Sequence, residues 1–192
     1  MNATTDTAPS LLKSRLQLLA LAVVFFGPFL YAAWLFYGDN WVPPETTNNG
    51  ELVDPPLQLP NIPVTAYNGD VDEALRGLWT LFYVEREACG EQCRDSLVQI
   101  RQIRLAAGRD VDRIRRIYLG ATLPETEWLD AGHKGLVAAR FADNETLAAT
   151  VESLDTGYYL IDPVGQVMMR YDTSVESKPL YKDLHRLLKL TR

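Results

Sequence analysis

The sequence predicts a three-layer α/β domain preceded by one transmembrane helix, and two observations carry this prediction. A run of 22 residues near the N-terminus holds no charged side chain, and at about 1.5 Å per residue it is long enough to cross a bilayer. After this run, apolar segments of strand length alternate with segments of helical spacing. Such alternation is typical of a sheet covered by helices on both faces. The 192 residues suffice for this one domain and its anchor.

The apolar run covers residues 16–37 and predicts a retained membrane anchor. Lys13 and Arg15 precede it, whereas acidic residues follow it and the next basic residue is Arg76. The positive-inside rule therefore predicts a cytoplasmic tail over residues 1–15 and an exported remainder, which in a bacterium means a periplasmic domain on the inner membrane. A cleaved signal peptide is the alternative, but the run is longer than a usual signal core, and either reading exports the domain.

Residues 38–64 predict an extended tether between the anchor and a domain over residues 65–192. Six of the 11 prolines of the chain lie in this segment together with an Asn-Asn-Gly tripeptide. We expect mostly irregular structure there and no helix, because proline and glycine interrupt regular elements.

The periodicities after the tether predict strands and helices in alternation. The parallel strands come first and an antiparallel pair comes last, around the turn formed by Asp-Pro-Val-Gly. We expect strands at 77–84, 113–119, 136–141, 157–161 and 166–171, and helices at 93–107, 124–129, 144–152 and 178–190.

The charge balance excludes several function classes. A formal net charge of −6 argues against nucleic acid as a partner, because phosphate binding needs a basic surface. Two Cys and two His without the spacing of a zinc site argue against structural zinc. The arginines between Arg101 and Arg116 predict a solvated surface paired with nearby acids, and the less favoured alternative is a site for an acidic lipid or partner.

The chemistry-bearing motif is Cys89-Gly-Glu-Gln-Cys93, which lies between the first strand and the first long helix. A helix N-terminus favours the thiolate form of a cysteine, and this spacing brings both side chains to one helical face. The pair could exchange disulfides, hold Cu(I) between two sulfurs, or form a permanent structural disulfide, and two cysteines do not choose among these roles.

Three features together resemble the thioredoxin-like superfamily, and within it the Sco/SenC type of membrane-anchored copper proteins. They are the N-terminal anchor, the cysteine pair after a strand with Trp79 and Tyr83, and the hairpin Tyr159–Gly165. The stretch Asn49–Pro55 also looks similar to small bacterial membrane proteins encoded among oxidase assembly genes. The resemblance implies a thioredoxin-like fold and a role in cytochrome c oxidase biogenesis, with oxidase subunits or other assembly factors as partners and copper as a cofactor. It implies Cys89 as the exposed redox or Cu(I)-binding sulfur and Cys93 as its partner.

Two departures from that pattern argue against a complete Sco-type copper site and against general disulfide exchange. Sco-type proteins place a copper-ligand histidine where this chain has Leu154, and oxidoreductases of the fold place a cis-proline in a segment that here, over 150–157, has no proline. We expect Asp155 to lie near the sulfurs and His133 at the opposite end of the sheet. The competing function is therefore a non-catalytic interaction module whose cysteines form a structural disulfide.

Overall fold

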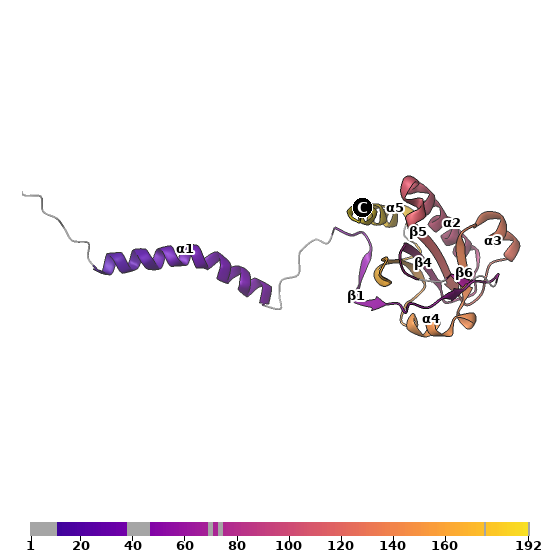
Figure 1. Cartoon of the computed structure of the whole chain (residues 1–192), viewed down its shortest axis with the longest axis horizontal. Coiled ribbons are helices and arrows are strands. Elements are labelled where there is room, and N and C mark those ends of the chain that lie inside the picture. Colours follow the sequence, from indigo (N-terminus) through magenta and orange to yellow (C-terminus); the bar gives the residue numbers. More distant parts are fainter. Residues whose placement is uncertain (1–10, 38–46, 69–70, 73–74, 175, 192) are drawn as a thin grey trace, which may run out of the picture. The chain divides into compact units, whose positions relative to one another are not determined.

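The computed structural model describes residues 11–37, 47–68, 71–72, 75–174 and 176–191. The chain divides into two compact units, residues 1–47 and 48–192 (Figure 1). The first unit contains α1 (Leu11–Tyr37), which includes the predicted anchor; by length and composition its segment Lys13–Leu35 can cross a membrane. Residues 1–10 of the predicted cytoplasmic tail and residues 38–46 of the predicted tether lie outside the described residues.

The second unit is built on a six-stranded sheet with the order β1-β8-β7-β4-β5-β6. A separate two-stranded sheet pairs β2 with β3. The strands are β1 (Glu51–Gln58), β2 (Val64–Thr65), β3 (Val71–Asp72), β4 (Trp79–Glu85), β5 (Ile114–Gly120), β6 (Leu136–Arg140), β7 (Gly157–Ile161) and β8 (Gln166–Tyr171). The helices are α2 (Glu91–Ala106), α3 (Thr126–Gly132), α4 (Glu145–Thr150) and α5 (Ser177–Leu190), with the 3₁₀ turns η1 (Gly108–Arg113) and η2 (Phe141–Asp143).

The strand directions confirm the expected topology. β4, β5 and β6 run parallel, whereas β7 runs antiparallel to both β4 and β8. The β4-α2-β5 connection is the helical crossover that parallel strands require. The N-terminus of α2 therefore follows the carboxyl end of β4, and its last turns return toward the beginning of β5.

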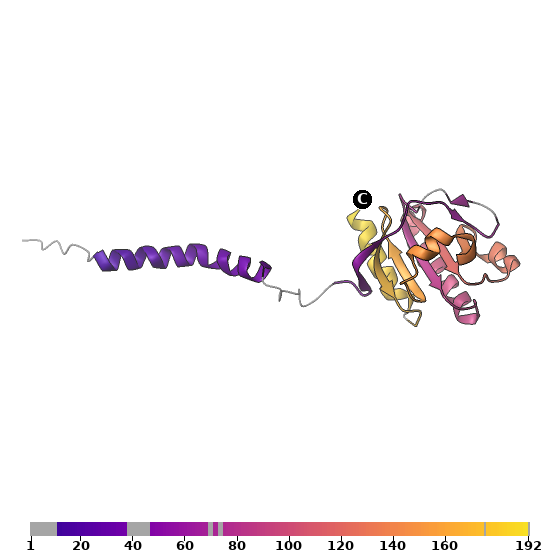
Figure 2. The same ribbon diagram turned by 90° about the horizontal axis from the view of Figure 1, so that it is seen from below.

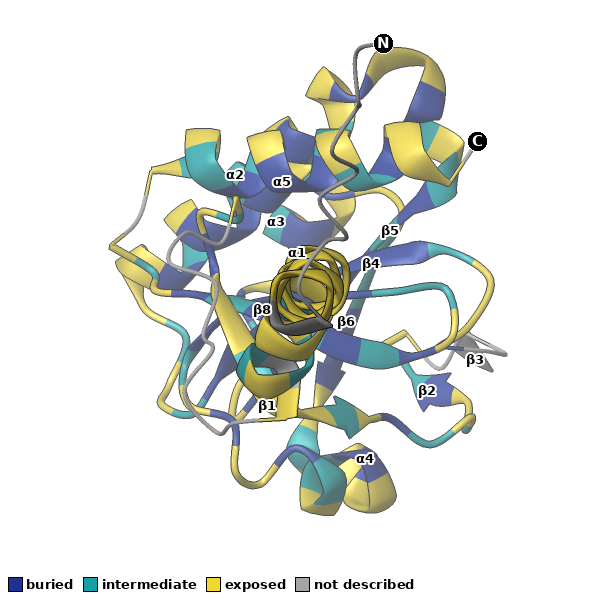
Figure 3. Ribbon diagram, turned by 90° about the vertical axis from the view of Figure 1, so that its left-hand side faces the viewer, coloured by how far each residue is buried: buried dark blue, intermediate teal, exposed yellow. Residues whose placement is uncertain are grey.

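Alternating side chains of the central strands form two separate apolar clusters, one on each face of the sheet. The sheet and the helices packed on its two faces are the three predicted layers. On β4, Leu81 and Tyr83 pack with residues of α2 and α5, whereas Phe82 and Val84 pack on the other face of the sheet. Figures 1 and 3 show α2 and α5 on one side of the sheet and α4 on the other, and Figure 2 views the domain from the α4 side. The α/β three-layer prediction is confirmed.

The expectation of irregular structure over residues 38–64 is wrong for residues 51–58. They form β1, which pairs antiparallel with β8 at the edge of the sheet. Pro55 and Pro56 lie inside this strand, where the pairing register shifts between Leu52 and Leu57. An edge strand tolerates prolines because one row of its backbone N–H groups has no partner strand to bond. The folded unit therefore begins at Asn48 rather than after the proline-rich segment.

A buried carboxylate fastens the beginning of this edge strand to the last helix. Asp183 of α5 accepts hydrogen bonds from the backbone N–H groups of Asn49 and Gly50 at 2.7 and 3.1 Å and from the Tyr171 hydroxyl at 2.8 Å. A side chain at position 50 would collide with the Tyr171 ring, so the close approach requires glycine. The Asn-Asn-Gly tripeptide thus belongs to the folded unit.

Candidate functional site

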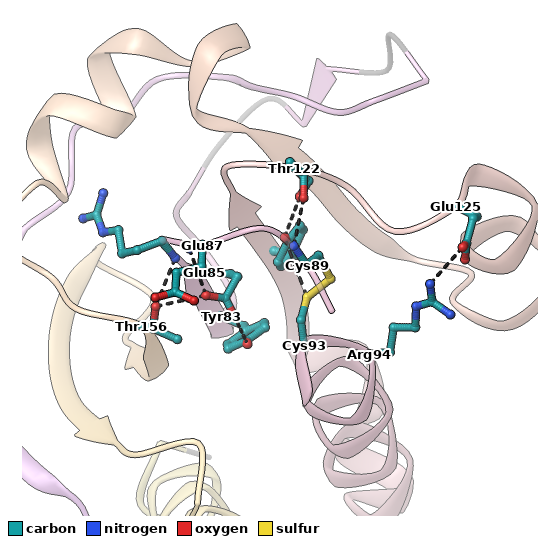
Figure 4. Close-up of a disulfide and its surroundings, with 11 residues drawn as sticks. Tyr83, Glu85, Glu87, Cys89, Cys93, Arg94, Thr122, Glu125 and Thr156 are labelled. Carbon is teal, nitrogen blue, oxygen red and sulfur yellow. Dashed lines mark hydrogen bonds and ion pairs between the residues drawn. A yellow bond between two sulfur atoms is a disulfide. The ribbon is translucent and has the colours of Figure 1, made fainter. Parts of the chain in front are cut away.

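A disulfide joins Cys89 and Cys93 where β4 gives way to α2 (Figure 4). The two Cα atoms are 5.2 Å apart. Cys89 lies in the loop before the helix and is partly exposed, whereas Cys93 in the first turn of α2 is 1 % exposed. The only sulfur of the pair that a partner could reach from solvent is therefore that of Cys89. The helix N-terminus beneath the pair stabilises negative charge on a sulfur released by reduction.

The loop that carries Cys89 is fixed by hydrogen bonds to neighbouring strand ends. The Cys89 backbone N–H donates to the Thr122 hydroxyl at 2.8 Å, and the Arg86 backbone N–H donates to the Thr156 hydroxyl at 3.0 Å. Thr122 follows β5 and Thr156 precedes β7, so the loop is held from both sides of β4 (Figure 4). The position of the exposed sulfur is set by these contacts rather than by the loop sequence.

Three tyrosines pack together beneath the buried sulfur. The rings of Tyr118 and Tyr158 lie 5.7 and 5.3 Å from the ring of Tyr83 between centroids. The Tyr118 hydroxyl is 3.8 Å from the Cys93 Sγ and donates to the Thr122 carbonyl at 2.7 Å. Burial raises the pKa of Tyr83, Tyr118 and Tyr158, so all three remain neutral hydroxyls at neutral pH. A neutral hydroxyl beside Cys93 can accept a hydrogen bond from the thiol or donate one to a thiolate.

A buried carboxylate, Glu85, ends β4 in the same cluster. It is 8 % exposed and accepts hydrogen bonds from the Tyr83 hydroxyl at 2.7 Å, the Thr156 hydroxyl at 3.1 Å and the Glu87 backbone N–H at 3.1 Å (Figure 4). Three donors satisfy this acid without a cationic partner among them. Its negative charge adds to burial in raising the pKa of the Tyr83 and Tyr118 hydroxyls.

The structure corrects the expected placement of Asp155, and it turns Leu154, which stands in place of the Sco-type histidine, away from the sulfurs. Leu154 packs in the apolar cluster on the opposite face of the sheet from Cys93. The Asp155 side chain is 77 % exposed and pairs with Arg170 at 3.3 Å. The side chain of Thr156 accepts a hydrogen bond from the Arg86 backbone N–H of the cysteine loop, whereas Leu154 contributes only its carbonyl, which accepts from the Arg86 Nε at 2.8 Å.

The two histidines lie apart from the cysteine pair. His133 follows α3 and borders a cavity of about 740 Å³ together with the residues that begin β5 and β6, which is the opposite end of the sheet from the disulfide, as expected. His185 stacks on Tyr181 along α5, with ring centroids 5.6 Å apart. Within the described part of the chain, no three His, Cys, Asp or Glu side chains gather as a metal site.

Four residues of the site were not predicted from the sequence: Glu85, Tyr118, Thr122 and Thr156. One signal was available, because Glu85 is the sole charged residue of an otherwise apolar strand and lies four positions before Cys89. The two threonines carried no comparable signal. They approach the cysteine loop because strands far apart in the sequence are neighbours in the sheet.

The arrangement of sheet, helices and cysteine loop is the thioredoxin-like fold, and comparison with solved structures bears this out. Copper-bound ScoI of Bradyrhizobium japonicum matches with a TM-score of 0.51 and 21 % identity, over 68 % of this chain and 96 % of that one. Apo Sco1 of Thermus thermophilus matches with a TM-score of 0.59 and 13 % identity, over 75 % and 99 %. A thiol:disulfide interchange protein from Bacteroides sp. matches with a TM-score of 0.51 and 15 % identity, over 73 % and 90 %.

Residues 79–191 match the family described as "Transmembrane-like, thioredoxin-like, C-terminal domain". The chain belongs to this family. No curated protein matches the sequence. The expected resemblance to the thioredoxin-like superfamily is confirmed, and Sco proteins are among its structural neighbours.

Proposed function

We propose that this chain is a membrane-anchored thiol–disulfide exchange protein that acts through Cys89 and Cys93 in cytochrome c oxidase biogenesis. One observation carries the proposal: the disulfide lies at a helix N-terminus with one accessible and one buried sulfur. The structural likeness to a thiol:disulfide interchange protein supports the fold for such a role. The oxidase context comes from the sequence resemblance.

The exchange reaction follows from the unequal exposure of the two sulfurs. In the reduced pair, the Cys89 thiolate attacks a partner disulfide, one partner sulfur leaves as a thiolate and takes a proton, and a mixed disulfide forms. The Cys93 thiolate then attacks the Cys89 Sγ, which releases the second partner sulfur and restores the Cys89–Cys93 disulfide. The partner disulfide gains two electrons and the cysteine pair loses them. A dithiol protein on the same side of the membrane must return the pair to its reduced form.

The reduction potential of the pair in the full-length protein tests this proposal. Structural disulfides typically have potentials below about −300 mV, and exchange-active pairs lie well above this value. We expect the Cys89–Cys93 pair to equilibrate with glutathione buffers above that limit. A pair that stays oxidised in these buffers would overturn the proposal and would support the non-catalytic interaction module.

A genetic experiment tests the oxidase context separately. We expect oxidase activity and its copper content to fall in a strain that carries Cys89→Ser and Cys93→Ser. A matched strain with Ser153→Ala, which changes a hydroxyl outside the cysteine site, should retain both. Unchanged oxidase in the double cysteine mutant would contradict a role in oxidase biogenesis without affecting the measured potential.

A second candidate function is the handling of Cu(I) as cargo by the reduced pair. It is favoured by the adjacency of two sulfurs at the beginning of α2, since two thiolates can hold Cu(I) in a near-linear arrangement. We expect the reduced protein to take one equivalent of Cu(I) from a chromogenic chelator, and Cys93→Ser to take none. The third Sco-type ligand does not fit, because Leu154 faces away from Cys93. Leu154→His should accordingly bind Cu(II) no better than the parent.

The membrane topology belongs to the same proposal. We infer an N-terminus in the cytoplasm and a folded unit in the periplasm from the basic residues before α1 and the acidic residues after it. A reporter enzyme fused after Arg192 should be active only in the exported compartment. Activity of that fusion in the cytoplasm would reverse the orientation.

A further inference from the structure

One arginine is buried at the end of the sheet opposite the disulfide. Arg116 of β5 is 2 % exposed, and its Nη2 donates to the Lys134 carbonyl at 2.7 Å. Its Nε and Nη1 are also buried, yet they donate to no residue that the structure describes. A buried guanidinium with two unused N–H groups is costly, because water no longer solvates the charge. The side chain is therefore held in a state that favours binding an acceptor.

Arg116 lines a pocket of about 230 Å³ between α2, β5 and the end of α3. Three further cationic side chains line the same pocket: Arg101 and Arg104 from α2, and Lys134 from the loop before β6. Arg101 and Arg104 are three residues apart, so they lie on one face of the helix. The Arg104 Nε donates to the Ile114 carbonyl at 2.8 Å, which fixes this side chain against β5.

The pocket has no acid to balance these charges among the described residues that line it. Burial lowers the pKa of Arg116, and together with the positive charges of Arg104 and Arg101 it brings this pKa to about 10. Repulsion among like charges in a pocket partly shielded from water is relieved by an anion. The sequence-based expectation of a solvated basic surface is thus wrong for Arg116, which is the buried base of the pocket.

We propose that this pocket binds a phosphate group, with Arg116 as the buried donor and Arg101, Arg104 and Lys134 around its mouth. A guanidinium donates charge-assisted hydrogen bonds to the oxygens of an oxoanion, and the Nε and Nη1 of Arg116 are its donors that no described residue occupies. Four cationic side chains favour a doubly charged phosphate over a singly charged carboxylate. The group comes either from free phosphate or from the headgroup of an anionic lipid, which share this chemistry.

Titration of inorganic phosphate into the full-length protein in nanodiscs of phosphatidylcholine tests the proposal. We expect saturable binding, and Arg116→Met should weaken it by at least about tenfold because it removes the buried positive charge and its charge-assisted donors. The exposed residue Lys134 offers a variant that spares the core, and Lys134→Gln should weaken binding about two- to fivefold. Acetate at the same concentrations should bind more weakly than phosphate.

The matched control is Lys178→Gln, which removes one exposed positive charge at the beginning of α5, outside the pocket. It should bind phosphate like the parent. Equal weakening by Lys178→Gln and Lys134→Gln would mean that phosphate responds only to net charge, and it would overturn the proposal. Absence of phosphate binding by the parent would overturn it as well.

The source of the phosphate group is decided by repeating the titration in nanodiscs that contain phosphatidic acid. If phosphatidic acid weakens the apparent affinity for inorganic phosphate in the parent but not the residual affinity in Arg116→Met, the lipid headgroup is a competitor for the same pocket. An unchanged affinity would assign free phosphate. Both results keep the phosphate site, and a cysteine-free variant should give the same results because the disulfide is at the other end of the sheet.

Discussion

Two buried charged side chains, Glu85 near the disulfide and Arg116 toward the opposite end of the central sheet, differ in how far their hydrogen bonds are satisfied. At the disulfide end, Glu85 accepts three hydrogen bonds and the Tyr118 hydroxyl donates to a carbonyl. At the other end, two nitrogens of Arg116 and the Nδ1 of His133 have no partner among the described residues. The same two elements, α2 and β5, connect both ends. A satisfied network fixes the geometry of a covalent site, whereas an unsatisfied one leaves donors available for a ligand.

Loss of the accessible sulfur should have the largest effect and should be confined to the disulfide end. Cys89→Ser leaves Cys93 buried and without a partner, so we expect no exchange with a disulfide-containing peptide. The same variant should bind inorganic phosphate like the parent. An effect on both activities would show that the two ends are coupled, and the comparison would then fail.

His133 predicts an acid sensitivity that arises at the arginine end. Burial lowers its pKa from 6.5 to about 4, and the charges of Arg116 and Arg101 act in the same direction. On acidification the unfolded chain takes up this proton near pH 6.5 while the folded protein resists it until about pH 4. Stability is therefore present above pH 6.5 and is lost as the pH falls through this window, by about 3 kcal/mol.

Urea unfolding of the folded unit in the full-length protein, measured at pH 7.5 and at pH 4, checks this prediction. His133→Gln should lose less stability than the parent over this interval, because glutamine does not titrate. Acidic residues contribute equally to both proteins, so the difference between them isolates the histidine. Identical pH dependence in the two proteins would contradict it.

Arg116→Met should stabilise the fold in phosphate-free buffer while it removes phosphate binding. Methionine fills much of the same volume and leaves no buried charge without a partner. We expect a gain of about 1 kcal/mol in the free energy of unfolding, measured with urea. A loss of stability would mean that the hydrogen-bond donors of the guanidinium are already satisfied in the folded protein. The contrast between the two ends would then be smaller than the geometry indicates.

The smallest effect is expected from the hydroxyl beside the buried sulfur. Tyr118→Phe removes a group 3.8 Å from the Cys93 Sγ that can stabilise the reduced form. A loss of about 1 kcal/mol corresponds to a reduction potential lower by about 20 mV. The matched control is Tyr158→Phe, since that hydroxyl donates to Gln99 on the same face of the sheet. Equal shifts for both variants would assign the effect to general packing.

The sequence determined the layers and most elements of the fold, because their periodicities are local. The hairpin strands over 157–161 and 166–171 agree with β7 and β8 residue for residue, and the helix expected over 93–107 agrees with α2 to within two residues. The cysteine motif also identified the pair that forms the disulfide. Hydrophobic spacing and helix-start residues contain this information within a few turns of chain.

Tertiary structure decided what depends on pairing between distant segments. β1 forms despite its prolines because β8 and Asp183 supply partners more than 100 residues away. Thr122 and Thr156 reach Cys89 because β5 and β7 flank β4. Arg116 shares the α2 face of β5 with Ile114 and Tyr118, so its burial is set by the packing of α2 and α3 over that face. Local sequence cannot encode such neighbours, since each depends on which strands become adjacent.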